Sequence, residues 1–277
     1  MFWRKKLLLA FLLTALAFDL AAARIVCTTY PVWLLTRVVV QTAPGVDLTL
    51  LINPAAGCAH DFTPSAGDLR QASQAGTILI ANGAKLDDHI VQSLRKVNPA
   101  IRVIQCADTD PAKDAHQFIS PDTALFMAKN IMQNLSELTP ENRAIYAHNF
   151  QQLKSQLDHL NARLRAMKPR RVVLQSALFL NLAQAANCQA IEIKSGHSDI
   201  LAAHALKKLL RHIRQTRPAM LWCEKGSADN TVSIIRKSIN IPAVQLDSML
   251  SGPANPPGDY FVKVMRANLD AIEKAGK

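Results

Sequence analysis

Residues 139–167, TPENRAIYAHNFQQLKSQLDHLNARLRAM, decide the architecture of this chain because their pattern is that of one unbroken helix. Thr139 is suited to cap the first turn, Pro140 fits the first helical position, and Pro169 ends the helix. At about 1.5 Å per residue, about 28 residues make a rod of roughly 42 Å, longer than one small domain needs. Apolar residues at alternating steps of four and three form one stripe along this rod: Tyr146, Phe150, Leu153, Leu157, Leu160, Leu164 and Met167.

On each side of this helix the sequence alternates strands and helices. A basic residue and a β-branched run open both sides, at 24–26 and at 171–173. This alternation is typical of parallel sheets with helices on both faces. We therefore expect an α/β protein with two doubly wound lobes, residues 24–138 and 169–277, joined by a long backbone helix at residues 139–168. The predicted strands are 24–29, 47–52, 77–81, 101–105, 172–175, 189–193, 219–224 and 243–246.

Residues 1–23 have the features of a secretory signal peptide that is removed from the mature protein. Basic residues at 4–6 precede an apolar run at 7–18 that is too short for a stable membrane anchor, and three alanines at 21–23 offer a cleavage site. The three residues before Cys27 are not the small ones that precede a lipidated cysteine. We therefore expect a periplasmic protein that is not a lipoprotein.

The charge of the chain is strongly positive but dispersed. The formal net charge of +11 falls by two when the leader, with three basic residues and one acid, is removed. Aromatic residues make up only 5% of the chain, so an exported nucleic-acid-binding protein is not expected. An anionic membrane surface or partner is the better explanation of the charge. The basic residues lie on helix faces, including Lys207, Lys208, Arg211, Arg214, Arg163, Arg165 and Lys168.

The cysteines number five, in a compartment where disulfides form, so at least one does not pair within the chain. Cys58 and Cys106 lie in two polar loops, where either is a candidate soft metal ligand or the two form a disulfide. The pairing is left open among Cys27, Cys58, Cys106, Cys188 and Cys223.

Four polar residues follow the carboxyl ends of predicted strands, where open α/β sheets bind ligands. They are His60 and His116 in the first lobe and Gln175 and Asp247 in the second. Two imidazoles and a carboxylate form a ligand set that a divalent first-row metal accepts. His197 also lies in a strand-end loop, whereas the other five histidines lie in predicted helices.

These residues sit in motifs that resemble the periplasmic solute-binding proteins of zinc and manganese ABC transporters, the helical-backbone cluster. The resemblance covers nearly the whole mature chain, in the order of that family. The motifs that carry it are Thr28-Thr29-Tyr30-Pro31, Ala59-His60-Asp61-Phe62-Thr63-Pro64, Asp114-Ala115-His116-Gln117-Phe118, Leu138-Thr139-Pro140-Glu141 and Val244-Gln245-Leu246-Asp247.

The resemblance implies a metal site made of His60, His116, Gln175 and Asp247, with zinc as the first choice and manganese or iron second. In that family the position of Gln175 is occupied by a histidine in zinc binders and by a glutamate in manganese binders. Gln175 offers only a neutral, weaker amide oxygen. The metal would be cargo for a membrane permease of an ABC transporter. We expect a monomer that is not an enzyme.

Two other functions remain open. The same fold could bind a chelated metal or a small organic solute, with His60 and His116 as hydrogen-bonding groups, because Gln175 is not a strong metal ligand. A zinc-dependent hydrolase would also use three protein ligands and a water. Glu224 is the one strand-end acid of the second lobe that qualifies as its general base, and no HExxH motif is present.

Overall fold

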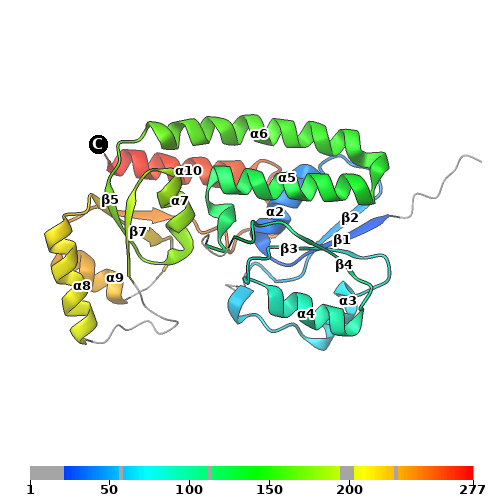
Figure 1. Ribbon diagram of the computed structural model, residues 1–277, viewed down its shortest axis with the longest axis horizontal. Coiled ribbons are helices and arrows are strands. Elements are labelled where there is room, and N and C mark those ends of the chain that lie inside the picture. Colours follow the sequence, from blue (N-terminus) through cyan, green and yellow to red (C-terminus); the bar gives the residue numbers. More distant parts are fainter. Residues whose placement is uncertain (1–21, 56–58, 111–113, 194–202, 228–229, 277) are drawn as a thin grey trace, which may run out of the picture.

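The computed structural model describes residues 22–55, 59–110, 114–193, 203–227 and 230–276. Figure 1 shows two α/β halves side by side, with one long helix, α6, running along both of them. In those ranges no helix is both long enough and apolar enough to cross a bilayer.

The first half is built on a four-stranded parallel sheet with the order β2-β1-β3-β4. The carboxyl ends of all four strands therefore lie along one edge. The strands are β1 (Ala23–Cys27), β2 (Val46–Leu50), β3 (Ile78–Ala81) and β4 (Arg102–Gln105). The helices that accompany them are α2 (Tyr30–Val39), α3 (Ala66–Ala72), α4 (Asp88–Val97) and α5 (Pro121–Leu138).

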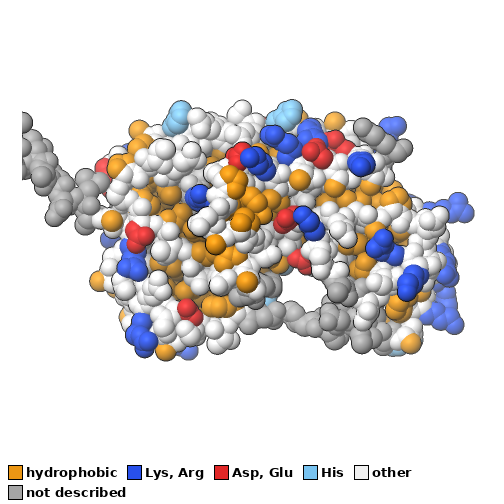
Figure 2. Space-filling model, turned by 180° about the vertical axis from the view of Figure 1, so that it is seen from behind, with side chains coloured by type: hydrophobic (Ala, Val, Ile, Leu, Met, Phe, Trp, Pro, Cys, Tyr) orange, Lys and Arg blue, Asp and Glu red, His pale blue; other side chains and the backbone are white. Residues whose placement is uncertain are grey.

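The second half repeats this plan with the order β6-β5-β7-β8, again all parallel. The fold class predicted from the sequence is confirmed: two parallel sheets with surrounding helices. The strands are β5 (Arg171–Leu174), β6 (Gln189–Glu192), β7 (Met220–Glu224) and β8 (Ala243–Leu246). The helices are α7 (Leu180–Ala185), α8 (Ala203–Thr216), α9 (Asn230–Ser238) and α10 (Tyr260–Ala275). Figure 2 shows Lys and Arg side chains gathered at the end of the molecule where α8 lies.

The long helix α6 (Arg143–Ala166) contains 24 residues and begins three residues later than the sequence predicted. A 3₁₀ turn, η3 (Pro140–Asn142), precedes it. The Thr139 hydroxyl does not cap α6, because it bonds the Leu135 carbonyl of α5 and the Tyr146 hydroxyl instead, at 2.8 and 3.0 Å. Thr139 therefore closes the end of the preceding helix.

The apolar stripe of α6 is buried against elements of both halves. Along the helix, α6 contacts α2 and α5 of the first half and α7 and α10 of the second. Tyr146, Leu157 and Leu164 are completely buried. One hydrophobic core cluster consequently extends from the first sheet through α6 into the second half. A separate, smaller cluster fills the space between the second sheet and α8 and α9.

Asn149 is one of the polar residues that fasten α6 to the first half, and we expect its removal to destabilise the protein. Its side-chain amide donates to the Val39 and Gln41 carbonyls at the end of α2, at 3.0 and 2.6 Å. Asn149→Ala leaves two carbonyls without this donor, so the free energy of unfolding should fall by about 1–3 kcal/mol in urea denaturation. Gln152→Ala, at an exposed position of the same helix, should change it by no more than about 0.5 kcal/mol. Equal losses in the two variants would contradict this role.

Candidate metal centre

His60 lies in a 3₁₀ turn, η1 (Ala59–Asp61), between β2 and α3. The chain after it is fixed by a reciprocal cap at the start of α3: the Ser65 hydroxyl accepts from the Asp68 N–H at 3.2 Å, and the Asp68 carboxylate accepts from the Ser65 N–H at 2.8 Å. The His89 ring also bonds the Phe62 carbonyl at 2.9 Å. These bonds hold the segment that carries His60 against α4.

His116 directly precedes a second 3₁₀ turn, η2 (Gln117–Ile119), after β4. The completely buried Gln117 closes this loop, because its amide accepts from the Asp108 N–H at 2.8 Å and donates to the Asp108 carbonyl at 2.7 Å. The rings of His60 and His116 meet edge to face, with centroids 5.9 Å apart. The structure therefore brings together the two histidines predicted in the first half.

Asp114 orients His116, a role that the sequence motif did not reveal. Its Oδ1 lies 2.7 Å from His116 Nδ1 and also accepts from the His116 backbone N–H at 2.8 Å. With the ring proton held on Nδ1, the lone pair of the imidazole is on Nε2. A carboxylate behind a histidine is the usual support of a metal-binding imidazole. The Asp-x-His spacing of Asp114 and His116 was the feature of the sequence that could have indicated this contact.

The environment of Asp114 keeps its carboxyl ionised. Burial by itself would raise the pKa of Asp114, but the hydrogen bonds and charge of His116, with a further contribution from His60, outweigh it and lower the pKa below the usual value. The Asp114 carbonyl accepts from the Asn181 side chain of α7 at 3.1 Å. A residue of the second half thus supports the loop that holds His116.

Gln175 lies at the carboxyl end of β5, where its amide joins two strand ends of the second sheet. The amide oxygen accepts from the Glu224 N–H at 2.8 Å, and the amide nitrogen donates to the Ser227 hydroxyl at 2.7 Å. Only 8% of the residue is exposed. Gln175 therefore braces the turn after β7, and its oxygen already accepts a backbone hydrogen bond.

Asp247 directly follows β8, at the carboxyl edge of the second sheet. Its Oδ1 accepts from the Met249 N–H at 2.9 Å, and Asn268 of α10 bonds both its backbone N–H and its carbonyl. The chain after Asp247 reaches the first half, because the hydroxyl of Tyr30, at the start of α2, donates to the Pro253 carbonyl at 2.9 Å.

The predicted ligands are only partly assembled in this structure. Among the residues that the structure describes, no three His, Cys, Asp or Glu side chains form a group able to hold a metal ion. Asp247 therefore does not join the pair of His60 and His116. Cys58 and His197 lie outside the described residues.

Cys106 is a free, completely buried thiol in this structure. Burial raises the pKa of its thiol well above the usual value, which disfavours the thiolate that binds metals. In this arrangement Cys106 is unsuited to act as the soft ligand that the sequence allowed.

Two parallel sheets share one long helix, and two predicted ligands meet at the carboxyl edge of the first sheet. The sequence model of one family, zinc-uptake complex component A, periplasmic, matches residues 25–275. The chain belongs to this family, and it is a metal-binding substrate-binding protein of an ABC transporter.

Curated relatives and solved structures agree with this assignment. The metal ABC transporter substrate-binding lipoprotein SloC of Streptococcus mutans is 24% identical over 239 residues, which cover 77% of this chain and 78% of SloC. The manganese ABC transporter substrate-binding lipoprotein PsaA of Streptococcus pneumoniae is 22% identical over 238 residues, 77% of each chain. The Ni²⁺ complex of FpvC from Pseudomonas aeruginosa superposes with a TM-score of 0.78 at 21% identity, covering 91% of this chain and 96% of FpvC. All three are named as substrate-binding proteins.

The prediction that this protein is not a lipoprotein was wrong, because both SloC and PsaA are named as lipoproteins. The prediction rested on the composition of the three residues before Cys27. A lipid anchor is a covalent addition near the chain terminus that folding does not determine. The three residues before Cys27 were therefore too little evidence to exclude one. The extracytoplasmic location is supported by the same relatives.

Asp114→Asn is expected to weaken binding of a divalent metal ion by about 10–100-fold, because the neutral amide no longer holds the His116 proton on Nδ1 as a carboxylate does. Calorimetric or competitive metal titration measures the change. Asp158→Asn, which removes an exposed carboxylate from α6, is the control and should bind as the parent does. Unchanged affinity in Asp114→Asn would exclude Asp114 as the support of a metal ligand.

Proposed function

We propose that this protein captures one divalent transition-metal ion, zinc first and manganese or iron second, between the carboxyl edges of its two sheets. The ion would be delivered to the membrane permease of an ABC transporter. The observation that carries the proposal is the pair of His60 and His116, with Asp114 bonded to His116 Nδ1. Two imidazoles so placed suit zinc, which prefers nitrogen donors at about 2.0–2.1 Å.

The third strong ligand in this proposal is Asp247. A carboxylate has two oxygens, so Asp247 can keep its bond to the Met249 N–H and still offer an oxygen to the metal. Gln175 is the fourth and weakest donor, since its oxygen also accepts from Glu224. Binding would draw Asp247 towards the histidines.

The movement that joins these ligands is expected to be small. The segment after Asp247 is tied to α2, because the Tyr30 hydroxyl donates to the Pro253 carbonyl at 2.9 Å and Arg37 donates to the Pro256 carbonyl. The helix α6 also packs against both halves. Rearrangement of the strand-end loops, rather than a wide hinge opening, would therefore bind and release the ion.

A chelated metal or a small organic solute is the second candidate cargo. It is favoured by the engagement of both ends of the Gln175 amide and by the separation of Asp247 from the histidine pair. In that function the two histidines would donate hydrogen bonds to the solute and accept hydrogen bonds from it.

Competitive zinc and manganese titration of the mature protein separates these functions. We expect one zinc ion per chain, with affinity lowered about 100-fold or more in His60→Ala and in His116→Ala, because each variant removes one of three strong ligands. His159→Ala, on the surface of α6, is the matched control and should bind zinc as the parent does.

Gln175→His tests directly whether the weak donor at this position limits metal binding. An imidazole there adds a strong donor, so zinc affinity should rise about tenfold or more. Zinc binding that appears only in this variant, and not in the parent, would contradict zinc as the cargo and favour a chelated or organic solute. Delivery is tested by cellular metal content, which should fall when the gene is deleted and recover with the parent sequence but not with His116→Ala.

A further inference from the structure

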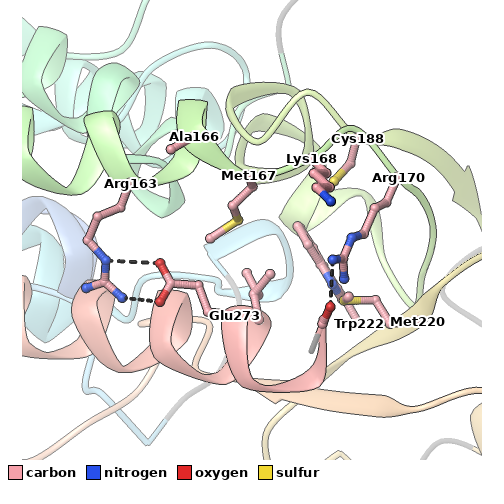
Figure 3. Close-up of a pocket in the computed structure, with 11 residues that line it drawn as sticks. Arg163, Ala166, Met167, Lys168, Arg170, Cys188, Met220, Trp222 and Glu273 are labelled. Atoms are coloured by element: carbon pink, nitrogen blue, oxygen red, sulfur yellow. Dashed lines mark hydrogen bonds and ion pairs between the residues drawn. The ribbon is translucent and has the colours of Figure 1, made fainter.

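A pocket of about 340 Å³ lies at the opposite edge of the second sheet from Gln175 and Asp247. Its walls come from the last turns of α6 and α10, from residues at or before the starts of the strands, and from Trp222 in the middle of β7 (Figure 3). A pocket of this size is large enough for a small organic ligand. No part of the proposed metal site contributes to it.

The pocket is lined mainly by apolar side chains around one buried donor. Met167, Met220 and Ile272 supply flexible aliphatic surface. Trp222 of β7 also lines the pocket and is completely buried, and its indole N–H has no hydrogen-bond partner. An indole N–H can only donate, and buried donors are rarely left unpaired. An acceptor group on a ligand would satisfy this donor.

The charge around the pocket favours an anion. Arg163 is paired with two carboxylates, Glu273 at 3.1 and 2.9 Å and Asp270 at 2.6 Å. Arg170 instead donates to the neutral Gly276 carbonyl at 2.6 Å, and no carboxylate of the described residues pairs with it. Lys168 adds a second cation on an exposed side chain. In Figure 3, Lys168, Arg170 and Trp222 gather at one end of the pocket and the Arg163–Glu273 pair lies at the other.

We propose that this pocket binds a small amphipathic monocarboxylate with an alkyl or aryl tail. The carboxylate accepts from the Trp222 indole N–H and pairs with Arg170 and Lys168. The tail lies against Met167, Met220 and Ile272. An inorganic anion would leave this apolar surface unused, and a neutral lipid would leave Arg170 and Lys168 without a carboxylate partner among the described residues.

Octanoate is the probe of choice, with octan-1-ol and acetate as matched ligands that lack the charge or the tail. Calorimetry on the mature protein should detect octanoate binding that is at least about tenfold stronger than binding of either control ligand. Trp222→Phe keeps the aromatic surface and removes the N–H, and Arg170→Gln removes the charge. Each should weaken octanoate binding about tenfold, whereas Arg165→Gln, an exposed cation outside the pocket, should not.

A second readout requires no variant. Cys188 lines the pocket and is partly exposed, so octanoate should slow its modification by N-ethylmaleimide several-fold, located by peptide mass spectrometry, and acetate should not. Absence of octanoate binding, equal binding of octan-1-ol, or binding unchanged in both Trp222→Phe and Arg170→Gln would overturn the proposal. Zinc titration of the same samples reports on the metal site separately, because none of its ligands lines this pocket.

Discussion

The burial of one face of α6 is the constraint on which the rest of this structure depends. The helix is too polar on its outer surface to lie in a core, and its apolar stripe is too long for one small α/β unit to cover. Two sheets with their helices therefore share it, α2 and α5 covering one part and α7 and α10 another. Because both sheets are held against the same rod, the relation between their carboxyl edges is largely set before any ligand binds.

The proposed metal site would use the same edges, and the hydrogen bonds around its residues differ between the two halves. On the first half, Gln117 and Asp114 hold His116 beside His60 without a metal. On the second half, Asp247 and Gln175 are bonded to their own strand ends. The first half thus holds two imidazoles side by side. In the proposed site Asp247 would keep its bond to the Met249 N–H, and Gln175 would share its oxygen with the Glu224 N–H.

Most of the fold could be predicted because periodicity is a local property of the sequence. The strand and helix alternation and the α6 stripe both follow from spacing alone, and β8 begins and ends where predicted.

The side-chain partners could not be found this way, because they depend on residues distant in the chain. Thr139 closes α5 instead of opening α6, and Gln175 bonds Glu224 and Ser227 across the sheet. A 3₁₀ turn, η4 (Ala177–Phe179), precedes α7, and there the Ser176 hydroxyl accepts from the Leu178 N–H. Asp114 was visible in its motif, but its contact with the His116 ring depends on the fold of the loop.

The division of the interior into one large and one small hydrophobic cluster has a consequence for cooperativity. Since the large cluster passes through α6 into both halves, the two sheets cannot melt independently, and most of the chain behaves as one unfolding unit. The small cluster is separate, and Ile213 is the one residue of α8 that is buried. We therefore expect the corner formed by α8 and α9 to open more readily than the remainder of the molecule.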